Sequence, residues 1–152
     1  MIQIRKSSFE TNSSSVHMLV IPKDEKIIIP SHVFLYGGEY GWESDHVTDT
    51  INYVYQACLD RDNTEVMKFI YYLTQKGIEV TYAGQETQQY INTGYVDHSG
   101  CVPLEDLFRN SKMLDRFLFG GGWVDTGNDN SDNCPNEKNY DSNKYDVLTK
   151  YN

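Results

Sequence analysis

Cations and long apolar runs are scarce in this sequence of 152 residues. Its 13 lysines and arginines are outnumbered by 22 aspartates and glutamates, and the formal net charge is −9. Direct binding of nucleic acid requires clustered cations, whereas these are scattered singly along the chain. The charge therefore argues against direct binding of nucleic acid or of an anionic membrane. It is typical of a soluble protein, or of one that meets a basic partner.

Cysteine is also rare. Cys58, Cys101 and Cys134 are odd in number and widely spaced, and no Cys-x-x-Cys pair occurs. This pattern argues against a disulfide framework and a zinc site, and reduced thiols in a cytosol explain it most simply. The start MIQIRKSSFE lacks the apolar core of a signal peptide, and no later segment approaches membrane-spanning length. We therefore expect a cytoplasmic protein without a membrane segment, a metal or another cofactor.

Tyrosine, in contrast, is abundant: there are 12, against six phenylalanines and two tryptophans. Because a tyrosine ring is apolar while its hydroxyl prefers water, such a surplus is typical of rings at the edge of a core or in an interface.

Hydrophobic periodicity divides the chain into a strand-rich beginning and a helical middle. Strands are predicted at 1–6, 16–21, 78–83 and 123–125, with one or two more between 26 and 38, split at Pro30. Helices are predicted from a cap at Ser44 to Cys58, from a cap at Asn63 to a stop at Gly77, and from Pro103 to Leu118, with Ser111 as the candidate cap of a second segment. Cys58 would lie on an apolar helix face, in the core.

This order of elements predicts the α+β class: a single compact domain with a mixed or antiparallel sheet and two to four helices mainly on one face. We assign residues 1–125 to this domain. Residues 126–152 are rich in Asn and Asp, and we expect a surface loop or tail of the same domain. Val147 and Leu148 would anchor its end.

The loop between the first two predicted strands is the main candidate site. Hydroxyls and amides in a turn can bind an anion, and the neighbouring Arg5 and His17 would strengthen such a site. The same residue types also fill ordinary turns, because their side chains bond to their own backbone. Both interpretations stay open for the residues that form the loop: Thr11, Asn12, Ser13, Ser14 and Ser15.

Other chemistries have weaker support. Ser15 and His17 would share a strand face, but no Gly-x-Ser-x-Gly elbow and no orienting acid accompany them, so binding is favoured over catalysis. Asp125, Asp129 and Asp132 lack the spacing of a calcium loop. A solvated acidic loop is the preferred interpretation of these three aspartates.

The stretch IRKSSFETNSSSVHMLVI resembles the start of short, mostly uncharacterised proteins encoded by bacteriophages and mobile elements of bacteria. The shared opening is Arg-x-x-x-Phe-Glu-Thr-Asn-Ser-Ser-Ser-x-His, from Arg5 to His17, and it adds Glu10 to the candidate ligand-binding residues. Residues 117–130 are similar to a later segment of that family. The resemblance implies an accessory protein in the host bacterial cytoplasm, where such proteins often bind a host protein, a defence component or its nucleotide signal.

Three functions follow, in order of preference. The first is a small acidic phage-type accessory protein that binds, and in its strongest form inhibits, a host or antiviral-defence factor. The second is a protein, signal-sequestering or enzymatic, that binds a phosphate-bearing ligand or nucleotide through the Ser-rich loop. The third is a nucleic-acid mimic, which would need its acids concentrated on one face. Each is compatible with a homo-oligomer.

Overall fold

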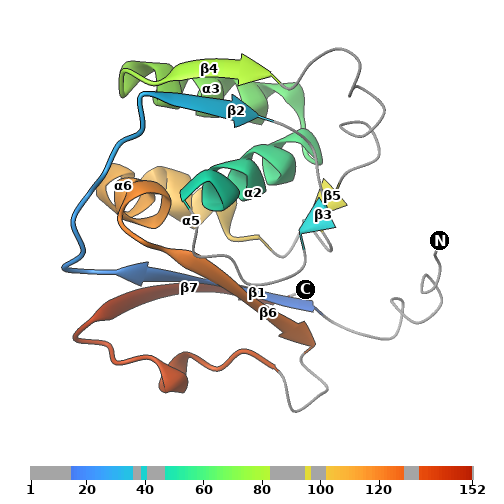
Figure 1. Cartoon of the computed structure of the whole chain (residues 1–152). Helices are drawn as coiled ribbons and strands as arrows, with labels where there is room; N and C mark the ends of the chain where they lie inside the picture. Colours follow the sequence, from blue (N-terminus) through green and yellow to red (C-terminus); the bar gives the residue numbers. More distant parts are fainter. Residues whose placement is uncertain are drawn as a thin grey trace, which may run out of the picture.

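The chain forms a layer of helices between an antiparallel sheet and a parallel pair of strands (Figure 1). The computed structural model describes residues 15–35, 39–40, 47–82, 95–96, 102–128 and 134–151. The predicted strand at 1–6 and the predicted cap Ser44 lie outside these residues.

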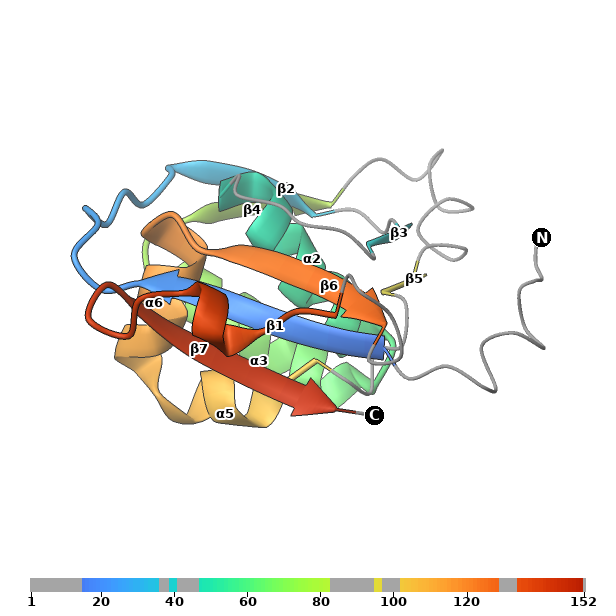
Figure 2. The same ribbon diagram turned by 90° about the horizontal axis from the view of Figure 1, so that it is seen from below.

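Strand β1 (Ser15–Pro22) is the centre of the antiparallel sheet, between β6 (Trp123–Asn128) and β7 (Tyr145–Tyr151). The three strands run side by side in Figure 2. The residues of β1 from Val16 to Ile21 are all buried. A central strand covered on both faces needs apolar side chains in succession rather than in alternation, and this explains the run that the sequence shows there.

Four helices are described: α2 (Val47–Leu59), α3 (Asn63–Gln75), α5 (Leu104–Arg109) and α6 (Ser111–Phe119). Leu19 and Ile21 of β1 share a core with Val124 of β6 and with buried residues of all four helices. Because residues two apart on a strand point the same way, this face of the antiparallel sheet is the one that carries the helices.

A second layer of strands closes the other side of the helices. Strand β2 (His32–Leu35) pairs in parallel with β4 (Glu79–Tyr82), and α2 and α3 form the crossover between them. A short parallel pair joins β3 (Glu39–Tyr40) to β5 (Tyr95–Val96). The prediction of a compact α+β domain is confirmed, although the described strands form three sheets instead of one. None of the helices in the described ranges is long and apolar enough to cross a membrane.

Helix α2 lies in the middle of the molecule, and all its residues from 50 to 58 are buried. Its polar side chains consequently need partners inside the protein. The Asn52 Nδ2 donates to the Phe34 carbonyl of β2 at 3.1 Å, and the Gln56 Nε2 donates to Asp60 Oδ1 at 3.0 Å. These bonds allow amide side chains to lie in an otherwise apolar interior.

The helix starts differ from the prediction by one residue in two places. Helix α3 is capped by Asp62, not Asn63, because the Asp62 carboxylate accepts from the Glu65 amide at 3.0 Å. Helix α6 is capped by Asn110, not Ser111, because the Asn110 Oδ1 accepts from the Met113 amide at 3.1 Å. The sequence allowed one helix or two between Pro103 and Leu118, and the structure has two segments, α5 and α6.

The predicted loop or tail of residues 126–152 is wrong at both ends, and at its start β6 continues to Asn128. Tyr145–Tyr151 forms strand β7, which pairs with β1 along its whole length, and Leu148 packs against the core as expected. Of the one or two strands expected between 26 and 38, β2 is described, whereas Ile27–Ile29 forms an exposed connection.

The turn between α6 and β6 allows no side chain at Gly122. A Cβ there would lie 2.6 Å from the Phe117 carbonyl oxygen and 2.7 Å from its ring. We expect Gly122→Ala to lower the free energy of unfolding by about 3 kcal/mol, since backbone and core must shift. Gly77→Ala is the matched control: its φ is +81° but nothing lies within 4 Å, so the cost should be about 1 kcal/mol. Urea denaturation measures both, and equal losses would contradict this account of the turn.

Candidate functional site

The predicted Ser-rich loop meets the described part of the structure only at its end. Ser15 begins β1, and His17 is the third residue of that strand. The remaining candidates lie outside the described residues: Arg5, Glu10, Thr11, Asn12, Ser13 and Ser14. The structure therefore does not test the ligand site at this loop, which stays a prediction.

His17 points into the protein. It is 1% exposed, and its Nδ1 lies within hydrogen-bond distance, 2.6 Å, of the Tyr53 hydroxyl on α2. In the sheet register Thr126 and Lys150 stand opposite His17 on the two neighbouring strands. The bond to Tyr53 ties the central strand to the central helix. The sequence pattern indicated a charge beside a loop at His17, and it gave no sign of this structural link.

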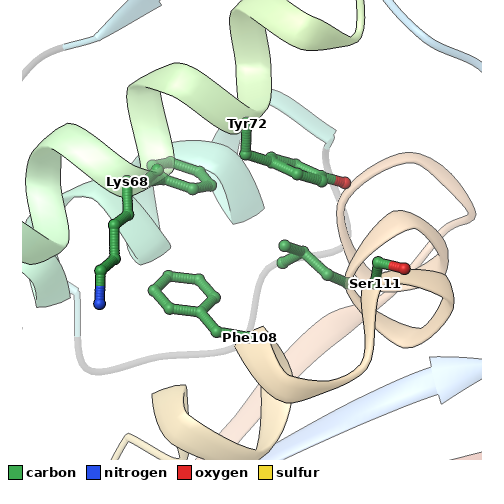
Figure 3. Close-up of a pocket in the computed structure, with 6 residues that line it drawn as sticks. Lys68, Tyr72, Phe108 and Ser111 are labelled. Atoms are coloured by element: carbon green, nitrogen blue, oxygen red, sulfur yellow. The ribbon is translucent and has the colours of Figure 1, made fainter.

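A pocket lies between α3 and the α5–α6 pair. We call it the α3–α5 pocket, and its volume is about 190 Å³. Figure 3 shows Lys68 and Tyr72 on one side and Phe108 and Ser111 on the other. The lining residues are Lys68, Phe69, Tyr72, Phe108, Ser111 and Leu114.

Aromatic rings give the pocket its shape. The Phe69 ring is stacked with Tyr72 on one side and with Phe108 on the other, at 6.2 Å between centroids in both cases. Aromatic pairs of this kind contribute stabilisation beyond the area they bury. The apolar lining is therefore built mainly from packed rings.

A polar network holds α3 against α6 at the edge of the pocket. The Tyr72 hydroxyl and the Lys76 Nζ both donate to the carboxylate of Asp115, the lysine at 2.8 Å. Lys76 also lies 5.4 Å from the centre of the Tyr72 ring. Burial, followed by the hydrogen bond and the negative charge of Asp115, raises the pKa of Tyr72. Tyr72 consequently stays a neutral donor near neutral pH.

The surface of α3 beside the pocket is unusually apolar. Met67 is 69% exposed and Tyr71 is 66% exposed. They are one helical turn apart, so they form a continuous strip, which we call the α3 ridge. Lys68 and Tyr72 form the next row around the helix and separate the ridge from the pocket. The surplus of tyrosine was the sequence signal for such a surface, although composition did not locate it.

The two cysteines of the described residues lie in different environments. Cys58 lies in the core as predicted, and burial, with a smaller effect of Glu65, raises the pKa of its thiol to about 12. The thiol therefore stays protonated and poorly nucleophilic. Cys134 is half-buried, and its thiol donates to the Pro135 carbonyl at 3.5 Å.

The acidic stretch near residue 125 shows one structural role. Asp125 accepts a hydrogen bond of 2.8 Å from Tyr140, whose ring packs edge-on against Trp123 and Tyr145. Asp129 and Asp132 lie outside the described residues. In the part of the chain that is described, no three His, Cys, Asp or Glu side chains are grouped so that they could hold a metal ion.

Comparisons with models of known protein families, with curated protein sequences and with solved structures gave no match. The arrangement of the α3–α5 pocket and the α3 ridge is therefore the basis on which a function is proposed.

The buried tyrosine of the pocket predicts a specific pH dependence. An unfolded tyrosine has a pKa near 10, and the folded value for Tyr72 is raised. Tyr72 therefore makes its full contribution to the free energy of unfolding below pH 10, and this contribution decreases as the pH rises above 10. We expect Tyr72→Phe to be less stable than wild type at pH 8, but to lose stability less steeply above pH 10, by up to about 1 kcal/mol per pH unit.

Urea denaturation from pH 8 to pH 11.5 measures this slope at about half-unit steps. Tyr71→Phe, which removes an exposed hydroxyl from the same helix, is the matched control and should follow wild type. If the unfolding free energy falls with pH equally steeply in wild type and in Tyr72→Phe, the pKa of Tyr72 is not raised in the folded protein, and the account is contradicted.

Proposed function

We propose that this chain is a small acidic accessory protein of phage type that acts in the host bacterial cytoplasm by binding, and thereby inhibiting, a host or defence protein. The observation that supports a binding role is the α3 ridge, with Met67 and Tyr71 about two-thirds exposed beside an apolar pocket. Exposed apolar side chains and pockets that accept an anchoring side chain are both features of protein-binding sites.

The size of the pocket favours a protein partner over a free small molecule. Sites for small ligands and cofactors usually enclose about 300–1,000 Å³, whereas this pocket measures about 190 Å³. That space suits one inserted side chain, and the α3 ridge would add contacts outside it. Methionine and tyrosine are both enriched in protein interfaces.

The chemistry of the pocket also favours binding over catalysis. The hydroxyl group of Tyr72 is engaged with Asp115, and Asp115 is neutralised by Lys76. A raised pKa leaves Tyr72 unable to act as a base near neutral pH. These three groups hold two helices together and leave the rings as the surface offered to a partner.

The test is quantitative capture from host lysate with two matched double variants. Met67→Ser with Tyr71→Ser removes the α3 ridge, and Ile28→Ser with Phe34→Ser removes two other exposed apolar side chains on a different part of the surface. All four positions are exposed, so both variants should keep the melting temperature within a few degrees of wild type.

We expect wild type and the Ile28/Phe34 variant to recover the same stoichiometric protein and the ridge variant to lose it. With the recovered protein purified, calorimetry should give a Kd at least about tenfold weaker for the ridge variant, because two central apolar contacts are removed. Recovery of no stoichiometric protein, or equal affinity of both variants, would contradict the proposal.

A further inference from the structure

We propose that the partner inserts one apolar side chain into the α3–α5 pocket and places a carboxylate beside it, against Lys68. This inference rests on the proposed function and adds the chemistry of the segment that is bound. The bound segment of the partner is expected to carry an aromatic or branched apolar residue next to Asp or Glu.

The apolar half of this requirement follows from the pocket itself. A cavity of about 150 Å³ lined by apolar side chains accepts a molecule the size of benzene, and the α3–α5 pocket measures about 190 Å³. Phe69, Phe108 and Leu114 supply apolar walls. This space suits one phenyl, indole or leucine side chain.

The charged half follows from Lys68. Its side chain is 66% exposed and contributes to the lining of the pocket, and Figure 3 shows its amine projecting from α3 on the side of Phe108. The ion pair of the exposed Lys68 with the half-buried Glu65 is 3.8 Å long. Such a pair is weak, because water screens it, so a partner carboxylate can compete with Glu65 for the lysine.

Two other cations near these helices, Lys76 and Arg116, are each held by a close ion pair. Asp115 binds Lys76 at 2.8 Å, and Asp146 binds Arg116 at 2.8 Å. Among the described residues that line the pocket, Lys68 is the one cation. A carboxylate at the mouth of the pocket would therefore be directed to Lys68.

The distribution of charge makes this position selective. The segment from Asn63 to Lys76 contains two lysines and one glutamate. The segment from Leu104 to Phe119 contains three cations and three carboxylates. The two segments together therefore carry a formal charge of +1. The whole chain carries −9, which leaves −10 on the remainder. A carboxylate therefore meets less negative charge on these segments than on the rest of the chain, and an ion pair with Lys68 would fix the orientation of the bound segment.

Selection from a display library of random short peptides tests the inference directly on the purified chain. Wild type should enrich peptides with an apolar ring or leucine next to Asp or Glu. Lys68→Glu should enrich the same apolar residue next to Lys or Arg. A synthetic peptide of the wild-type consensus should bind Lys68→Gln about fivefold more weakly than wild type, the loss expected for one exposed ion pair.

Two tryptophan variants place the peptide on the molecule. Ser111→Trp fills the pocket from an exposed position on its rim and should abolish binding of the consensus peptide. Asn139→Trp lies in the 3₁₀ helix Glu137–Asn139, beyond the antiparallel sheet, and should bind as wild type does (Figure 1).

The role of Lys68 would be overturned if wild type enriched apolar peptides without a preference for Asp or Glu. It would also be overturned if Lys68→Glu enriched the same acidic peptides as wild type. Failure to enrich any peptide, or binding that survives Ser111→Trp, would overturn the role of the pocket. These outcomes are distinguishable from failure of the proposed function, because capture of a host protein through the α3 ridge is measured separately.

Discussion

The burial of α2 on every side is the constraint on which the rest of the structure depends. The antiparallel sheet and α6 cover it on one side, and α3 with the β2–β4 pair covers the other. Ordinary surface helices have a polar face in water, but this one has to satisfy Asn52, Gln56 and the Tyr53 hydroxyl inside the protein. Its partners on β1 and β2 consequently lock both layers of strands to the same helix.

A helix that is buried all round offers nothing to a partner, so recognition has to use the outer helices. Helix α3 divides its surface between the two tasks. Phe69 and Leu73 are buried against the core, while Met67 and Tyr71 remain in solvent. Tyr72 lies between them, and its bond to Asp115 fixes the distance between α3 and α6. The α3–α5 pocket is the space that this fixed distance leaves between the helices.

Local patterns in the sequence predicted α2, α3, β4 and the start of β6, because periodicity and helix stops are properties of neighbouring residues. The predicted helix caps were displaced by one residue. Asp62 and Asn63 can both cap a helix, and the side-chain geometry in the folded protein decides which of them does so. Strand β7 was missed because it depends on pairing with β1, about 130 residues away. The pocket was missed for the same reason, as its lining comes from helices distant in sequence.

Native-state hydrogen exchange along α2 tests this account most directly. If α2 is the buried centre of the domain, its amides from residue 51 to 58 open only when the whole protein unfolds. Their exchange should then report the same free energy as urea denaturation under the same conditions. Exchange of these amides through a local opening of lower free energy, while the amides of α3 stay protected for longer, would contradict it.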